Sequence, residues 1–337
     1  MKIRNIILAS LFLQMLTVPF ASADMGTVSV NPDVSLEEPG QRAIIAWNGE
    51  EEGMILTMHV SSGKYTKAVQ FLPLPSKPKE LGAASMDSFT EITELVLSRT
   101  GERGYAGGGG GISGEPEVIL KRTIGPHGIT VARSKDAESF VGWMNSFLEN
   151  EGVSGEISLS NYRSVVEDYM VRGYEYWIID IISLSGQKAI QPIYFRFPAD
   201  NLYYPLEITS PIGGEGEVGL FLLTDGKVEG EFAQLSKAKY LKTEPEVRLE
   251  PLELEVSSSR LENIDNRLSE IFPGTKDLTL TVLSYKGDLS ELDEDLKLGI
   301  ADQVTSSDSF LGGELVILSI VLVGAILGIL GIYKKSD

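Results

Sequence analysis

The first part of the chain alternates apolar and polar residues with the period of β-strands. We expect strands over 42–47 and 54–60 to form a hairpin around Asn48-Gly49 and the acidic stretch that follows it. Four apolar residues of the second strand share one face: Met54, Leu56, Met58 and Val60. A third strand is expected over 67–74, and a group of prolines ends it.

Helical periodicity follows in three places. Ser88 and Glu91 form a capping box before an apolar stripe, which predicts a helix over 88–96. Two further stripes repeat at i, i+3, i+4, i+7 and i+8: Phe140, Trp143, Met144, Phe147 and Leu148, then Tyr162, Val165, Val166, Tyr169 and Met170. The last of these helices is expected to begin at Ser160 and to end at Gly173.

Strands dominate the middle of the chain. A hairpin is expected around Gly125-Pro126, and 174–184 is apolar on both faces apart from Glu175 and Asp180, as in a covered central strand. Three more strands are expected over 190–197, 202–209 and 218–224. This order of elements predicts an α+β fold with a largely antiparallel sheet and helices packed on one side.

Residues 236–286 have a different texture and are expected to form a small extension or a second subdomain. They contain an extended stretch over 244–256, a helix over 259–272 and a strand over 277–285. Four residues of that helix are expected to point inward: Leu261, Ile264, Leu268 and Ile271. Residues 287–313 are rich in acidic residues and serine, which indicates a stalk.

Both ends of the chain carry apolar segments. Residues 1–23 combine Lys2 and Arg4, an apolar run and Ala21-Ser22-Ala23, which predicts a cleaved signal peptide; an uncleaved N-terminal anchor is the alternative. Residues 314–333 contain a run without charge that reaches about 28 Å as a helix, close to the hydrocarbon thickness of a bilayer. We therefore expect a single transmembrane helix there, with 24–235 as an α+β ectodomain outside.

The residues around this C-terminal segment refine its orientation. Lys334 and Lys335 predict that the tail, 334–337, is cytoplasmic. Gly324, Gly328 and Gly331 form a small-residue face that would allow two helices to dimerise. Alternatively, the segment is a sorting tail that is removed after export.

Composition excludes several classes of function. The chain of 337 residues has no cysteine and two histidines, which excludes disulfides, thiolate metal sites and a three-histidine metal site. A formal net charge of −19 argues against a nucleic-acid partner. We expect no metal and no cofactor.

Motifs of catalysis are weak. Gly214 to Gly219 matches GxGxxG, but a strand follows it instead of a helix, and its two glutamates would repel phosphate. A Ser-His-acid triad could use only His59, in a strand, or His127, in a hairpin turn. Paired carboxylates remain possible because acidic residues are abundant. No catalytic residue is predicted.

Three residues are candidates for binding. Trp47 and Asn48 could anchor a partner at the end of a strand, although a tryptophan there is more often packed. Arg196, between two phenylalanines of a strand, needs a carboxylate partner or a ligand anion.

Three stretches of the chain form a pattern found in a known family: Gly40 to Gly49 with Phe71 to Pro75, Gly125 to Val131 with Trp143 and Tyr169, and Tyr194 to Phe197 with Tyr204 to Leu206. In these stretches the chain resembles a family of secreted proteins called domain of unknown function 2330. Within this family the chain looks most similar to an archaeal branch with a shorter N-terminal region. It lacks the cysteine pair of bacterial members and has His127 where they tend to have tyrosine. The resemblance implies an exported protein of undetermined function.

Together these features predict a single-pass protein of the cell membrane whose ectodomain is a non-enzymatic binding or structural module of the cell envelope. Its partner would be another envelope protein or a second copy of the chain. An exported carboxylate-dependent hydrolase and a surface solute-binding domain are the alternatives.

Overall fold

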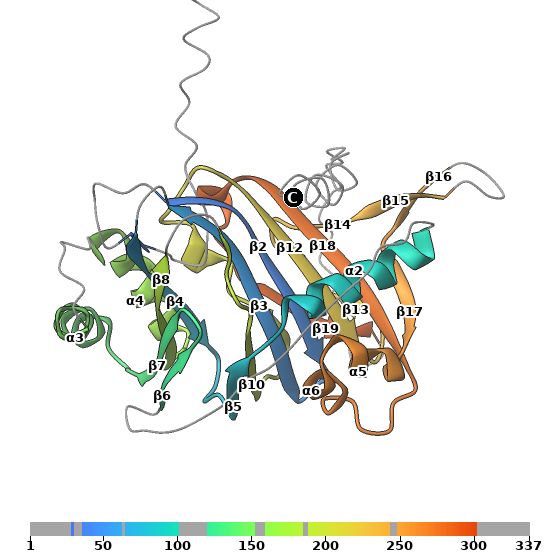
Figure 1. Cartoon of the computed structure of the whole chain (residues 1–337), viewed down its shortest axis with the longest axis horizontal. Helices are drawn as coiled ribbons and strands as arrows, with labels where there is room; N and C mark the ends of the chain where they lie inside the picture. Colours follow the sequence, from blue (N-terminus) through green and yellow to red (C-terminus); the bar gives the residue numbers. More distant parts are fainter. Residues whose placement is uncertain are drawn as a thin grey trace, which may run out of the picture.

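The computed structural model describes residues 28–29, 36–62, 65–100, 120–151, 159–184, 188–242 and 248–301. These residues form a body that is mainly β structure, in which two large sheets pack together and helices cover them (Figure 1). The predicted antiparallel sheets are confirmed, and the described residues are mainly strands with few helices.

A nine-stranded sheet forms the centre of the body. Its main path runs β14-β18-β12-β2-β3-β10-β5, with β17 added beside β18 and β9 beside β3. The strands are β2 Leu36–Trp47, β3 Glu51–Ser62, β5 Glu80–Ala83, β9 Lys188–Ala189, β10 Ile193–Pro198, β12 Glu215–Thr224, β14 Ser236–Lys237, β17 Glu253–Ser257 and β18 Asp277–Asp288. The predicted first hairpin is confirmed as β2 and β3, while β12 pairs with β2 in parallel.

A five-stranded antiparallel sheet lies against it, in the order β1-β4-β8-β7-β6. The strands are β1 Val28–Ser29, β4 Thr66–Leu74, β6 Leu120–Ile124, β7 His127–Arg133 and β8 Tyr176–Leu184. β8 is the central strand, as its apolar sequence predicted. β4 follows β3 in the chain but pairs with β8 in this second sheet.

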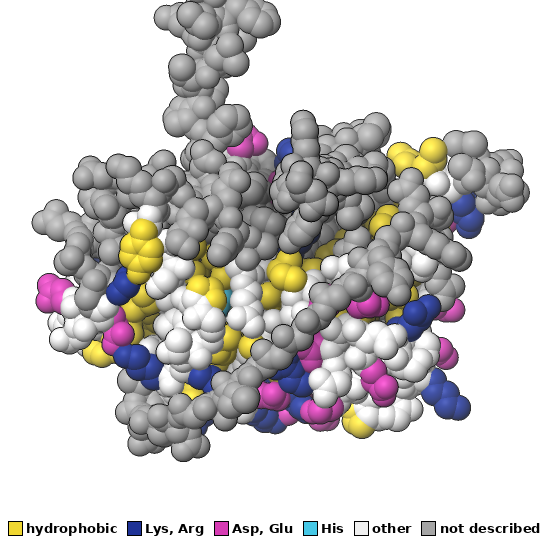
Figure 2. Space-filling model, viewed as in Figure 1, with side chains coloured by type: hydrophobic (Ala, Val, Ile, Leu, Met, Phe, Trp, Pro, Cys, Tyr) yellow, Lys and Arg dark blue, Asp and Glu magenta, His cyan; other side chains and the backbone are white. Residues whose placement is uncertain are grey.

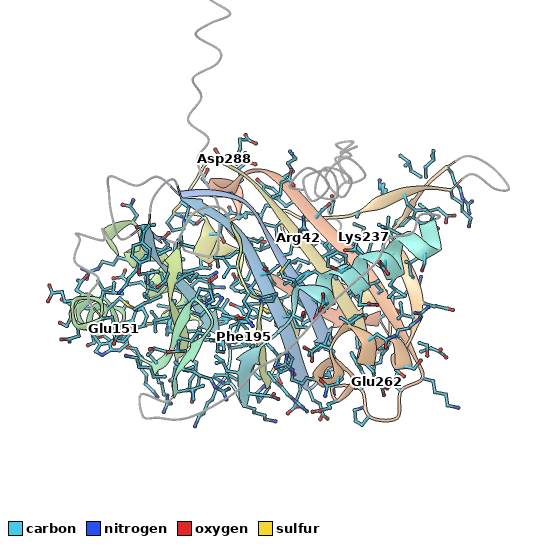
Figure 3. The ribbon with its side chains drawn as sticks, viewed as in Figure 1. Arg42, Glu151, Phe195, Lys237, Glu262 and Asp288 are labelled. Atoms are coloured by element: carbon cyan, nitrogen blue, oxygen red, sulfur yellow. The ribbon has the colours of Figure 1, made fainter. Side chains whose placement is uncertain are left out.

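Helices cover two faces of the body, whereas the sequence predicted one. α2 Met86–Thr100, α5 Leu261–Ile264 and α6 Asn266–Ser269 pack on one face of the nine-stranded sheet. α3 Ala137–Asn150 and α4 Arg163–Val171 pack on the five-stranded sheet, where Phe140 and Trp177 lie 4.8 Å apart between ring centroids. Each sheet has two apolar faces, so the face that does not meet the other sheet needs helices of its own. Figure 3 shows the side chains that fill the space between these layers, with Phe195 among them.

Two predicted helix starts are wrong. The Ser85 hydroxyl accepts from the backbone N–H of Asp87 at the start of α2, and Ser88 lies inside the helix, where its hydroxyl donates to the carbonyl of Ile264 at 2.7 Å. A 3₁₀ turn, η1 Leu159–Tyr162, precedes α4, which has no side-chain cap. The stop at Gly173 is confirmed by its φ of +90°, which favours glycine.

Residues 236–286 are an extension of the main body. β14, β17 and β18 belong to the nine-stranded sheet, and the predicted helix over 259–272 is the pair α5 and α6, separated by an extended Asp265. The four residues predicted to point inward are buried: Leu261, Ile264, Leu268 and Ile271.

The predicted start of the stalk at residue 287 is wrong. The chain continues through the end of β18, the 3₁₀ turn η4 Leu289–Glu291 and β19 Leu296–Ile300. β19 is the middle strand of a small sheet with β11 Leu202–Tyr204 and β13 Val228–Glu229. Four leucines of this stretch are buried: Leu289, Leu292, Leu296 and Leu298. The free energy gained by burying these leucines holds the stretch in the body. The acidic side chains between them can still reach solvent or a partner.

Several predictions fall on residues that the structure does not describe. They are the signal peptide at 1–23, the rest of the stalk, the transmembrane segment at 314–333 with Gly324, Gly328 and Gly331, and the tail at 334–337. None of the described helices has the length and apolar character needed to cross a bilayer.

Candidate functional site

The residues predicted at the end of β2 serve the fold. Trp47 is 1% exposed, and its indole N–H donates to the carbonyl of Ala199 at 2.8 Å. The Asn48 side-chain oxygen accepts from the backbone N–H groups of Glu50 and Glu51, and its amide donates to the carbonyl of Ile271 at 2.7 Å. Asn48 thereby closes the turn and ties it to the segment after α6. Both side chains thus bond to backbone carbonyls of the chain itself.

The sequence left two partners open for Arg196, a carboxylate or a ligand anion, and the structure shows the carboxylate. Its Nε and Nη2 donate to Glu51 Oε2 at 2.9 and 2.6 Å, and Nη1 lies 3.4 Å from Glu270. Lys79 also binds Glu51, and these contacts, with the Lys79 hydrogen bond as the largest, hold the pKa of Glu51 below its usual range. The arginine is satisfied by protein carboxylates, so no ligand anion is needed.

A buried histidine–aspartate pair lies between the two sheets. The sequence placed His127 in a hairpin turn, whereas in the structure it is the first residue of β7, directly after that turn. Asp180 lies on the neighbouring strand β8. His127 Nδ1 is 2.5 Å from Asp180 Oδ2, and His127 Nε2 is 2.8 Å from the carbonyl oxygen of Gln191. Both side chains are almost completely buried.

The hydrogen bonds of this pair limit its chemistry. A carbonyl oxygen only accepts, so Nε2 must carry a hydrogen, and Nδ1 shares a proton with Asp180. In a hydrolytic triad Nε2 faces the hydroxyl that it deprotonates. Here a backbone carbonyl occupies that position, so His127 cannot activate a nucleophile in this arrangement.

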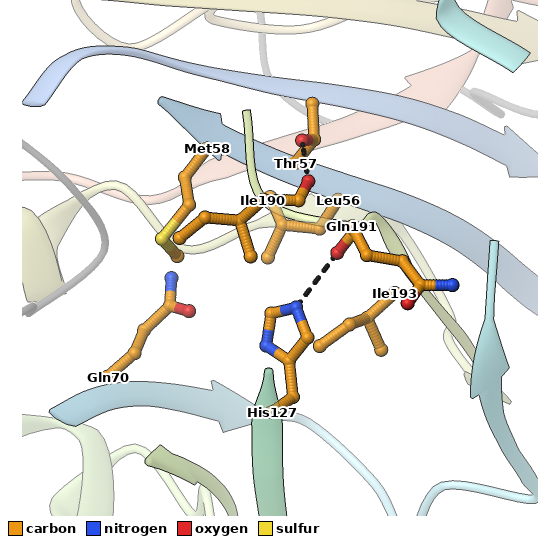
Figure 4. Close-up of a pocket in the computed structure, with 8 residues that line it drawn as sticks. All are labelled: Leu56, Thr57, Met58, Gln70, His127, Ile190, Gln191 and Ile193. Carbon is orange, nitrogen blue, oxygen red and sulfur yellow. Dashed lines mark hydrogen bonds between the residues drawn. The ribbon is translucent and has the colours of Figure 1, made fainter. Parts of the chain in front are cut away.

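A small cavity adjoins the pair (Figure 4). It has a volume of about 10 Å³, which is room for one water molecule, and Gln70 and His127 contribute its polar lining with Thr57 and Gln191. Gln70 Nε2 and Asp180 Oδ1 are buried and have no hydrogen-bond partner among the described residues. This cavity is far below the volume of about 300 Å³ at which small-molecule sites begin.

A second polar cluster surrounds Arg172, the residue after α4. Its Nη1 donates to Asp295 Oδ2 at 2.8 Å, and its Nη2 binds Glu207. Asp295 Oδ1 accepts from the Tyr169 hydroxyl at 2.5 Å and from the backbone N–H of Leu206 at 3.1 Å. The Asp295 side chain has no solvent exposure, whereas that of Arg172 is 27% exposed.

Burial and charge shift the pKa values of this cluster. Burial, reinforced by the charges of Asp295 and Asp168, raises the pKa of Glu207 to about 7, although Arg172 opposes the shift. Burial and the Asp295 carboxylate also raise the pKa of Tyr169 well above its usual value. Perturbed groups of this kind occur in active sites and in structural ion-pair networks alike. Glu207 and Asp295 both bind Arg172, and this arrangement is that of a structural ion-pair network.

The sequence did not identify this cluster or the histidine–aspartate pair. Arg172 and Asp295 are 123 positions apart in the chain, and no local motif joins them. The sequence contained two separate signals for the pair, which it did not join: Asp180 is one of two charges in an otherwise apolar strand, and His127 is one of the two histidines of the chain. The described residues contain no group of three or more side chains that could hold a metal ion.

Glu52 of β3 is a further buried acid. Its Oε2 accepts from the backbone N–H of Tyr203 at 2.7 Å, while its Oε1 has no partner among the described residues. Burial raises the pKa of Glu52 well above its ordinary value of 4.5. The folded state therefore retains a proton that the unfolded chain releases as the pH rises above 4.5. The stabilisation present below that pH is lost as the pH increases.

Replacing Glu52 with glutamine should stabilise the protein at neutral pH, by an amount on the order of 1 kcal/mol. Glutamine can still accept from Tyr203 but never ionises, so its advantage over glutamate should grow from pH 5 to pH 7. Urea unfolding of both proteins at several pH values measures this. Glu51→Gln is the matched control, because the lowered pKa of Glu51 gives the opposite sign. Parallel pH profiles for the wild type and Glu52→Gln would show that Glu52 does not titrate in this way.

Comparisons with known proteins give little. No protein-family model and no curated protein matches the chain. The crystal structure of baculovirus P35 matches with a TM-score of 0.43 and 9% identity, over 79% of this chain and 97% of that one. A chain from the crystal structure of the caspase-8/P35 complex matches with a TM-score of 0.39 and 10% identity, over 78% of this chain and 96% of that one. Both TM-scores are below 0.5, so neither match establishes a shared fold or function.

Proposed function

We propose that the protein is a single-pass membrane protein of the cell envelope whose extracytoplasmic body is a non-enzymatic binding or structural module. The apolar segments at 1–23 and 314–333, the lysines that follow the second of them and the resemblance to a secreted family support this location. The ectodomain would lie outside, and the short C-terminal tail would lie in the cytoplasm.

One observation supports the non-enzymatic assignment: the side chains that could act as acids or bases are already bonded to other groups of the chain. His127 Nε2 is bonded to a backbone carbonyl, and Glu207 and Asp295 bind the same arginine. A glycosidase-type pair would flank a cleft with its carboxyl groups about 5 to 9.5 Å apart and open to substrate. The geometry of these groups instead fits a role in holding the body together.

The position of β19 supports a mechanical role for the C-terminal part of the body. β19 ends at Ile300 and is hydrogen-bonded on both sides, to β11 and to β13. Asp295, just before it, accepts a hydrogen bond from Tyr169 of α4 and pairs with Arg172, the residue after α4. A pull from a membrane anchor would therefore act on a strand inside the body, which resists it along two ladders of hydrogen bonds.

The location is tested by comparing the full chain with a chain that ends at residue 313. We expect the full chain to remain in membranes after an alkaline carbonate wash and its body to be removed by protease added outside intact cells. The shortened chain should be released. Full protection of the body from external protease, or release of the full chain by carbonate, would contradict the proposal.

The nature of the module is tested by crosslinking intact cells and identifying neighbours of the body by mass spectrometry. A reproducible envelope partner, or the protein itself, is the expected result. Turnover of a peptide, glycan or ester by the purified protein, lost in Glu207→Gln, would replace the proposal with the hydrolase. Saturable binding of a small solute would replace it with solute capture.

A further inference from the structure

An isolated hairpin projects from the body at the edge of the nine-stranded sheet. It consists of β15 Lys239–Lys242 and β16 Arg248–Pro251, which pair only with each other among the described strands. Its base is fixed where the backbone N–H of Leu252 donates to the carbonyl of Ala238 at 2.7 Å. Figure 1 shows this hairpin extending away from the sheets. We call it the arm.

The two faces of the arm differ. On one face Tyr240 and Lys242 both bond to Glu250, and Tyr240 packs against the core. On the other face Leu241 and Leu249 lie opposite each other and are 56% and 51% exposed. Hydrophobic side chains are visible on the arm in Figure 2. A two-stranded hairpin with an exposed apolar pair is marginally stable and gains from an added strand.

The edge of the arm contrasts with the edge of the main sheet. At β5, the outermost strand of the main path, Arg267 Nη2 donates to the carbonyl of Ala83 at 2.9 Å, and Arg122 donates to the carbonyl of Leu81. These guanidinium groups occupy the acceptors that another strand would use, which is a common way of protecting an edge. Among the described residues, nothing pairs with the outer edge of β16.

We propose that the arm joins two copies of this chain, with β16 of one copy paired antiparallel to β16 of the other around Leu249. A two-fold axis at Leu249 places it opposite its own copy. It also places Arg248 of each chain opposite Glu250 of the other, and Glu250 opposite Arg248. The register is therefore complementary in charge and apolar at its centre. The resulting sheet has four strands, and Pro251, which lacks an N–H, lies at the end of the pairing.

The absence of cysteine from the natural chain allows a sharp test with the full-length protein. Opposite residues of an antiparallel pair have Cα atoms about 4.5 to 5.5 Å apart, within the range of a disulfide. Under mild oxidation, Leu249→Cys should form a disulfide dimer in roughly tenfold greater yield than Leu241→Cys. Position 241 is the matched control, because it is equally exposed on the same face but lies three strand spacings, about 14 Å, from its copy.

Each outcome decides the proposal. Equal yields at both positions would mean contact without this register and would overturn it, as would a preference for Leu241→Cys or no dimer at all. Dimerisation through the glycines of the segment at 314–333 would give equal yields at the two positions. The experiment therefore distinguishes it from dimerisation through the arm.

A charge exchange provides the second measurement. Arg248 binds Glu250 of its own strand. In the Leu249→Cys protein, Arg248→Glu should lower the yield of dimer, because the introduced glutamate would face Glu250 of the other copy as well as Glu250 of its own strand. Adding Glu250→Arg should restore it. An unchanged yield in Arg248→Glu would overturn the proposed register. The result does not depend on where in the cell the protein resides.

Discussion

Replacing Arg172 with methionine is expected to lower the free energy of unfolding by about 3 kcal/mol or more. The substitution keeps much of the side-chain volume but leaves the fully buried carboxylate of Asp295 without its counter-charge. Glu207 loses the same partner. Urea unfolding of the purified wild-type and variant proteins, followed by circular dichroism, measures the difference.

Two further variants separate the charge from the packing. Arg163→Met removes an exposed pair with Glu167 on the same helix, which is expected to cost about 0.5 kcal/mol or less. Adding Asp295→Leu to Arg172→Met should recover part of the lost stability, because the unpaired charge is removed. An Arg172→Met protein as stable as Arg163→Met would show that the cluster does not hold the C-terminal strand.

Replacing His127 with leucine is the other substitution with a large expected effect, a loss of about 3 to 5 kcal/mol. Asp180 would keep neither oxygen hydrogen-bonded to a described residue, because Oδ2 loses His127 and Oδ1 has no partner among these residues. The Gln191 carbonyl would also lose its donor. Hydrogen exchange should accelerate first in β7 and β8, whose pairing passes through both residues.

The double variant His127→Leu, Asp180→Leu gives the corresponding check. Removing both partners of a buried pair costs far less than removing one, so the double variant should be more stable than His127→Leu alone. Losses that simply add would show that the two side chains do not interact in the folded protein.

Local structure could be predicted from the sequence because it depends on near neighbours. The hairpin around Asn48 follows from alternation, and the central strand at 176–184 follows from its apolar composition. The stop at Gly173 follows from the glycine itself, which adopts a positive φ there. The division of strands between two sheets could not be predicted in this way. β4 leaves β3 to pair with β8, and β2 pairs with β12 across more than 170 residues, so each choice depends on distant apolar surfaces.

The polar clusters escaped prediction for a related reason. A buried charge is recognised by its partner, and Arg172 finds Asp295 only when the strand after η4 reaches α4. The many acidic residues at 287–300 led to the prediction of an exposed stalk, but the leucines between them are buried and hold this stretch in the body. In contrast, the need of Arg196 for a carboxylate or a ligand anion followed from its place in an apolar strand, and the Glu51 carboxylate meets that need.

The parallel pairing of β2 with β12 also dictates an order of folding. β2 is among the first strands to be synthesised, yet one side of it stays open until residues 215–224 are present. β18, which completes the ladder beyond β12, comes later still. Sheets assembled from such distant segments fold slowly. During synthesis the early hairpin is therefore exposed to unwanted association, and a chaperone that shields β2 until most of the chain has emerged would raise the yield of folded protein.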